Sequence, residues 1–147
     1  MASAQKDLLD LVVLLNRVAL GLFFLLAGAH KIGGGVGNFY QKGFLPLKPA
    51  WLPTWFAAPY GHLIPFAEVT VGVLLILGLM GRLGAALACL LLISFTIALA
   101  AAHLFFTGSG PFHTNVVFLT LALLLAVTGP GSLSADAIWR KSGRKAI

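Results

Sequence analysis

The chain has 147 residues, of which 59% are hydrophobic and 10% are charged, with a mean hydropathy of +0.98 and a net charge of +6. Soluble domains carry roughly 25% charged residues, so ten Lys and Arg and four Asp and Glu cannot cover a soluble globule of this length. The composition argues against a soluble enzyme, a disordered chain and a secreted disulfide scaffold, and indicates an integral membrane protein. In a membrane protein, excess basic residues set topology and contact anionic lipid. We therefore expect the lipid bilayer, and no nucleic acid, as a partner.

Four apolar stretches predict the secondary structure. A helix needs roughly 20 apolar residues to cross a bilayer, and the stretches cover about residues 8–30, 61–80, 83–106 and 113–128. They predict an all-α integral membrane protein, an antiparallel four-transmembrane-helix bundle with a long outer loop between helices 1 and 2. No repeat or linker divides the chain, so we expect a single membrane domain over 1–147 with a basic cytoplasmic tail at 132–147.

Lysine and arginine residues predict the orientation of this bundle. The side that holds both termini would carry six of them, whereas the other side would carry Lys42 and Lys48, with Lys31 at its edge. We therefore expect both termini to be cytoplasmic.

One stripe of the first predicted helix carries both cations and glycines. Steps of four and three residues place Arg17, Gly21, Phe24, Gly28 and Lys31 on one face. Glycines let another helix approach closely, so this face is expected to point into the bundle. Arg17 has two interpretations: it reaches the cytoplasmic interface or a nearby acid, or it makes a buried structural or ligand contact.

The outer loop, residues 32–62, is rich in aromatic residues and proline. Amphipathic aromatic rings suit the membrane–water interface, so the loop is either an aromatic belt without a specific ligand or a lid over a pocket. The aromatic residues concerned are Phe39, Tyr40, Phe44, Trp51, Trp55, Phe56 and Tyr60.

Glu68 is the only acidic residue inside an uninterrupted apolar stretch, near the outer boundary of the second span. Lys31 ends the first span at a similar depth, whereas Arg17 would lie about 20 Å deeper along the same helix. We therefore expect a structural ion pair between Lys31 and Glu68. The alternative is that Glu68 carries protons or binds a ligand, because desolvated acids often mark functional sites.

All four histidines map to the same outer level: His30, His62, His103 and His113. They are either simple interfacial residues or part of a site. The hypothesis for a site is that His30, Lys31, Glu68 and His103 bind a ligand such as a quinone headgroup. No metal site is expected, since the sequence has no His-x-x-x-His or His-x-x-Glu pair.

Three short motifs lie at the ends of the predicted spans, in this order along the chain: Arg17–Gly21 with Ala27–Lys31; Glu68–Leu79 with Arg82–Gly84; and Gly129–Gly131 with Ser134 and Asp136. Together they resemble the DoxX family over most of the chain. The resemblance implies a four-helix protein of the bacterial cytoplasmic (inner) membrane, related to the membrane subunit of thiosulfate:quinone oxidoreductase.

Three functions remain open. The first is an accessory or scaffold subunit of a membrane redox or respiratory complex, partnered by other membrane subunits or by further copies of itself. It would have no covalent redox centre, since the single cysteine, Cys89, cannot form an intramolecular disulfide. The second is a quinone-binding subunit of a membrane oxidoreductase, with its site near the outer face. The third is a small four-helix transporter.

Overall fold

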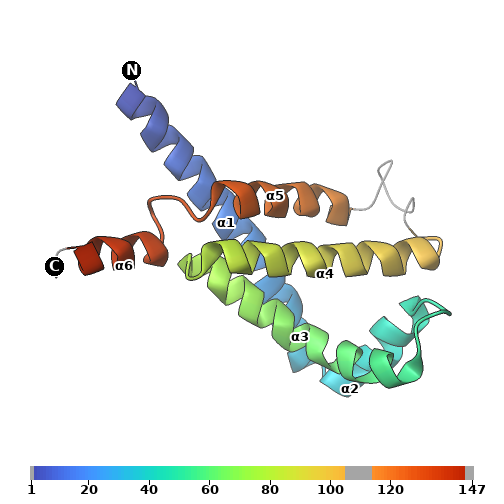
Figure 1. The fold of residues 1–147 in the computed structure, drawn as a ribbon. Coiled ribbons are helices and arrows are strands. Elements are labelled where there is room, and N and C mark those ends of the chain that lie inside the picture. Colours follow the sequence, from blue (N-terminus) through green and yellow to red (C-terminus); the bar gives the residue numbers. More distant parts are fainter. Residues whose placement is uncertain (1, 105–113, 145–147) are drawn as a thin grey trace.

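The computed structural model describes residues 2–104 and 114–144, and within them the protein is all-helical, with no strand (Figure 1). This confirms the all-α class. The principal helices are α1 (Ala2–Gly33), α3 (Thr54–Leu77), α4 (Gly81–Ala101), α5 (Thr114–Thr128) and α6 (Ala135–Arg144).

Three of these helices, α1, α3 and α4, are long and apolar enough to cross a membrane. The fourth apolar helix, α5, has 15 residues, which span about 22 Å at the usual rise per residue. That is shorter than the hydrocarbon core of a typical bilayer, about 30 Å. Residues 105, 106 and 113 of the predicted third and fourth spans lie outside the described residues.

The start of the second span differs from the prediction. We expected it near residue 61, but α3 begins at Thr54 and continues through Pro59 and Pro65. The carbonyl oxygen of Pro53 accepts hydrogen bonds from the backbone N–H groups of Phe56 and Ala57. The helix therefore starts inside the stretch of residues 32–62 that was predicted to be a loop. The prolines suggested a loop, yet membrane helices tolerate proline where neighbouring groups satisfy the freed carbonyls.

The predicted long loop is also more regular than expected. After Gly35, whose φ of 91° lies in the left-handed region, the chain forms three short helical pieces. They are α2 (Val36–Phe39), the π-helical turn η1 (Tyr40–Phe44) and the 3-10 turn η2 (Leu45–Leu47). No proline occurs between residues 36 and 45, so the backbone N–H groups there are free to form α2 and η1. In η2, Pro46 lies in the first turn, where a helix does not need its N–H.

Helices α1 and α3 pack against each other through glycine. A Cβ atom on Gly72 would lie 2.6 Å from the backbone nitrogen of Leu25 and 2.8 Å from the carbonyl oxygen of Gly21. A Cβ on Gly28 would lie 2.6 Å from the carbonyl oxygen of Pro65. The two backbones therefore touch, which is the small-residue packing typical of membrane helices. We call this contact the glycine seam.

The seam confirms the predicted inward face of the first helix. Arg17 and Phe24 are 2% and 0% exposed, and Gly21 and Gly28 on the same face are also buried. Helix α4 packs against both α3 and α5, and Figure 1 shows α4 and α5 side by side, with α1 crossing them at an angle. The core between these helices is formed by Leu20, Phe24, Val71, Leu75, Ala88, Leu92, Ala122 and Leu125.

The seam predicts that Gly72→Ala destabilises the protein. The new methyl group would overlap backbone atoms of α1, and overpacking of this kind costs about 1–3 kcal/mol, more than the roughly 1 kcal/mol that alanine gains over glycine in a helix. The measurement is the free energy of unfolding in detergent. Gly33→Ala is the matched control, because a Cβ there meets no atom within 4 Å. Equal stability of the two variants would contradict the seam.

Candidate functional site

A buried ion pair joins α1 to α3. The Nζ atom of Lys31 donates a hydrogen bond to Oε1 of Glu68. The Glu68 side chain is 2% exposed and that of Lys31 is 23% exposed. The second oxygen of Glu68, Oε2, has no hydrogen-bond partner among the residues that the structure describes. A carboxylate this buried is stable only with a close cation, so Lys31 determines whether Glu68 can remain charged.

The glycine seam explains why these two side chains meet. Gly28 touches α3 at both Pro65 and Val69, which lie on either side of Glu68. Lys31 is one turn beyond Gly28 on the same face of α1, so its long side chain needs to reach back only about one turn to the Glu68 carboxylate. Lys31 also lies in the last turn of α1, where the helix dipole favours a cation. Its Nζ atom is 5.0 Å from the centre of the Phe39 ring and 5.4 Å from that of Phe95, distances at which a cation is attracted to an aromatic face.

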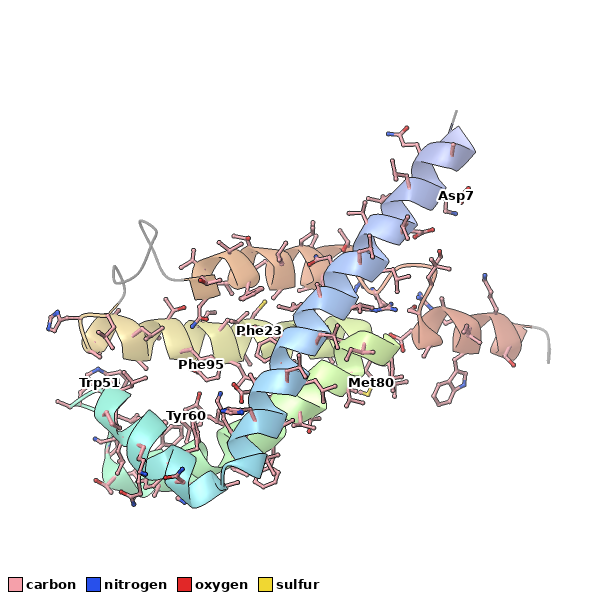
Figure 2. All side chains as sticks on the ribbon, turned by 180° about the vertical axis from the view of Figure 1, so that it is seen from behind. Asp7, Phe23, Trp51, Tyr60, Met80 and Phe95 are labelled. Atoms are coloured by element: carbon pink, nitrogen blue, oxygen red, sulfur yellow. The ribbon has the colours of Figure 1, made fainter. Side chains whose placement is uncertain are left out.

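A large cavity adjoins Lys31. Its volume is about 790 Å³, and it is partly open to the surroundings. It lies between α3, α4 and the segment of residues 39–52, and its wall is mainly apolar. Figure 2 shows Trp51, Tyr60 and Phe95, which line it from these three parts of the chain. The polar residues in the lining are Lys31, Lys48, Tyr60, Thr70, Ser94 and Asn115.

One hydrogen bond crosses from α3 to α4 in the cavity wall. The Tyr60 hydroxyl donates to Oγ of Ser94 at 2.5 Å, and Ser94 donates to the carbonyl oxygen of Leu91 at 2.8 Å. The bond orients the phenol ring of Tyr60 along the wall. It leaves the Tyr60 oxygen able to accept a further hydrogen bond, since a hydroxyl is both donor and acceptor.

The segment of residues 39–52, which we call the aromatic segment, is packed onto α3. Tyr40 stacks on Phe44, with ring centres 5.6 Å apart, and on His62, at 4.3 Å. Both Tyr40 and Phe44 lie over Gly61, where a Cβ would come within 2.7 Å of either ring. A side chain at Gly61 would therefore push the rings away, so this glycine lets the segment cover the cavity.

The structure brings together only part of the predicted ligand set. Lys31 and Glu68 are in contact, but His30 and His103 are exposed and do not line the cavity. His30 precedes Lys31 by one residue, which turns it about 100° around the helix axis. His103 follows the end of α4 with a left-handed φ of 57°, and His113 lies outside the described residues.

Sequence reasoning did not select Tyr60, Ser94 or Asn115 as site residues, although all three line the cavity. The available signal was the polarity of Ser94 and Asn115 within apolar stretches, because a polar group in such a stretch needs a partner. Spacing alone could not reveal that α3, α4 and α5 bring these residues to one cavity. No group of three or more His, Cys, Asp or Glu among residues 2–104 and 114–144 could hold a metal ion.

Arg17 lies near the middle of α1, beyond the opposite end of the glycine seam from Lys31. Its guanidinium donates to the carbonyl oxygens of Pro130 at 2.6 Å and Leu133 at 2.8 Å. Of the two interpretations of Arg17, the structure shows the buried structural contact. It fixes the chain between α5 and α6, and it does not contact Glu68.

The ion pair predicts a specific result from a double-mutant cycle. Lys31→Met leaves the Glu68 carboxylate buried without a cation, and breaking a buried pair in this way costs about 3–5 kcal/mol. Glu68→Gln should also destabilise, and the double variant should be no less stable than the worse single variant. The free energy of unfolding in detergent measures all three. Additive losses would contradict the pair, and Lys42→Met, at an exposed lysine, is the control for loss of a charge.

Comparison with known protein families corrects the expected relationship. Residues 9–128 match the family described as methylamine utilisation protein MauE. No curated protein and no solved structure matches the chain. The DoxX assignment was therefore wrong. It rested on short motifs of glycines and polar residues, among them Arg17, which here serve helix packing and carbonyl binding, and different membrane families can meet those needs with the same residues. The match covers most of the chain, so this membrane protein belongs to the MauE family.

Proposed function

We propose that the protein is a membrane-embedded accessory subunit of a redox system for the utilisation of methylamine or related amines. Membership of the MauE family supports this role. The chain has one cysteine, Cys89, which is buried among the core helices, so it offers no dithiol pair of its own. The redox centre would therefore belong to a partner subunit, and this chain would support that subunit in the membrane.

The proposed setting is a bacterial cytoplasmic membrane crossed four times, by α1, α3, α4 and α5. The direction of α5 supports the fourth crossing, because α5 runs back antiparallel beside α4 (Figure 1). Both termini would be cytoplasmic. In support, Arg82 lies in the first turn of α4, directly after the α3–α4 turn, and Arg140 and Lys141 lie in α6, near the same end of the bundle. Cations at this end agree with the bias of cytoplasmic loops towards Lys and Arg.

The accessory role predicts both a partner and a growth defect. Deleting the gene in its host should abolish growth on methylamine as the sole nitrogen source and leave growth on ammonium unchanged. Gentle detergent extraction of a tagged chain, followed by mass spectrometry, should recover subunits of an amine-oxidising system in fixed proportion. Unimpaired growth on methylamine, or recovery of a homo-oligomer alone, would contradict the accessory role.

A second candidate function is the binding of a quinone-type ligand, and the cavity favours it. Its volume of about 790 Å³ falls in the range of small-molecule sites, roughly 300–1,000 Å³. Lys31 has three N–H donors and uses one of them on Glu68, so it retains donors for a quinone carbonyl. The apolar side chains of Leu87, Leu90 and Leu91 on α4 continue the wall and would suit an isoprenoid tail. In this proposed quinone site the polar contacts come from Lys31 and Tyr60. The exposed His30 and His103, which the sequence had suggested as ligand residues, take no part.

Quinone binding predicts that phenylalanine has different effects at two alanine positions of α4. Ala98 lines the cavity, whereas Ala86 is exposed and does not. In a Trp55→Phe, Trp139→Phe background, decylubiquinone should quench the fluorescence of Trp51, a lining residue, in a saturable manner. Ala98→Phe should weaken this binding about fivefold or more, since overpacking costs about 1–3 kcal/mol.

Ala86→Phe is the matched control and should bind decylubiquinone as the parent does. Quenching that rises linearly without saturation, or that is the same in both variants, would show that the quinone merely dissolves in the detergent micelle. Either result would contradict the quinone site and leave the accessory role standing.

A further inference from the structure

A second hollow lies at the other end of the bundle, where α3 turns into α4 and the chain connects α5 to α6. Its volume is about 1080 Å³ and it is more open than the first cavity. Its lining mixes apolar residues, among them Met80, Leu83 and Trp139, with three cations: Arg82, Arg140 and Lys141. None of these residues takes part in the ion pair or the cavity described above.

Helix α6 forms a fixed wall of this hollow. The Asp136 carboxylate accepts hydrogen bonds from the backbone N–H groups of Met80 and Gly81, both at 2.8 Å, and its own N–H donates to the carbonyl oxygen of Gly78. Ser134, 2% exposed, caps α6 by accepting a hydrogen bond from the N–H of Ala137. Arg17 holds the preceding segment through the carbonyl oxygen of Leu133.

The docking of α6 positions its cations. Ala137 is buried against the bundle, 9% exposed, and residues three and four positions later share its side of a helix. Those residues are Arg140 and Lys141, which are themselves exposed. They therefore flank the hollow from α6, while Arg82 flanks it from the first turn of α4. Cations from two helices face the same space.

The charge around the hollow favours an anion. Asp136 is the acidic residue in its lining, but both of its oxygens are bound to backbone N–H groups at the start of α4. Its negative charge is thereby directed at the positive end of the helix dipole. The lining also contains three cations, so its net charge is +2, from three positive groups and one negative group.

The apolar part of the surface favours a lipid over a free ion. Met80 and Leu83 are 53% and 46% exposed beside Arg82, and Trp139 is 73% exposed on α6. Trp is enriched at the membrane–water interface, and basic pockets between helices at that level bind phospholipid headgroups. We propose that this hollow binds the phosphate-containing headgroup of an anionic phospholipid, with an acyl chain along Met80 and Leu83. Arg82, Arg140 and Lys141 contact the phosphate. The site is independent of amine utilisation and of the quinone cavity.

The test compares phosphatidylglycerol with phosphatidylcholine of the same acyl chains, counted on the detergent-purified protein by native mass spectrometry. The parent should retain phosphatidylglycerol and not phosphatidylcholine. Each cation near the surface contributes about 1 kcal/mol, about a fivefold change in affinity. The double variant Arg82→Gln, Lys141→Gln should therefore bind phosphatidylglycerol roughly 30-fold more weakly. The control Lys6→Gln, Lys42→Gln removes the same net charge outside the hollow and should bind as the parent does.

A second measurement is independent of the charge variants. In a Trp51→Phe, Trp55→Phe background, phosphatidylglycerol with brominated acyl chains should quench Trp139, and millimolar inorganic phosphate should not relieve the quenching. Equal retention of the two lipids, equal loss in the two double variants, or displacement by inorganic phosphate would overturn the proposal. Far-ultraviolet circular dichroism of each variant establishes that the fold is retained.

Discussion

The contact between the backbones of α1 and α3 determines where the polar groups of this protein lie. Gly21 and Gly28 on one helix and Gly72 on the other bring the two backbones so close that an added Cβ would overlap backbone atoms of the facing helix. In a bilayer, where lipid tails are as apolar as leucine, helices associate through such close packing. The seam fixes the rotation of α1, so both cations of its inward face are buried or partly buried. Lys31 meets Glu68 at one end, and Arg17 meets the carbonyl oxygens of the α5–α6 connection at the other.

The two ends of the glycine seam thereby support two different surfaces. At the Lys31 end, the ion pair adjoins the cavity that the aromatic segment covers, and Gly61 lets Tyr40 and Phe44 lie flat on α3. At the Arg17 end, the same helix anchors the chain that leads into α6, which carries cations beside the α3–α4 turn. Polar groups in membrane helices are costly and tend to be functional. Here Lys31 with Glu68, and Arg17 with the carbonyl oxygens it binds, lie beyond the two ends of the glycine seam, each close to one of the two hollows.

Periodicity and depth could be read from the sequence, but rotation and tertiary contact could not. The spacing of Arg17, Gly21 and Lys31 predicted the inward face of α1, and rise per residue brought Lys31 and Glu68 to one level, where they are in contact. The same depth argument grouped His30 and His103 with them, but depth says nothing about direction around a helix, and both histidines are exposed. The cavity depends on how residues 39–52 fold back onto α3, which the sequence pattern does not show. Pro53 and Pro59 made the region near Thr54 look like a loop, although α3 begins there. The family assignment was wrong because its motifs record helix packing, which is not specific to one family.

The glycine seam holds Lys31 on Glu68, and this contact can be measured directly because Glu68 is the only glutamate in the chain. Solid-state NMR in lipid bilayers, with ¹³C at the glutamate carboxyl and ¹⁵N at the lysine amines, reports the distance between the Glu68 carboxyl carbon and the nearest lysine nitrogen. The parent protein should give strong dipolar dephasing, which Lys31→Met abolishes and Gly72→Ala weakens. Dephasing that is absent in the parent would show that Lys31 and Glu68 are not paired, and dephasing that is unchanged in Gly72→Ala would show that the seam does not hold the pair.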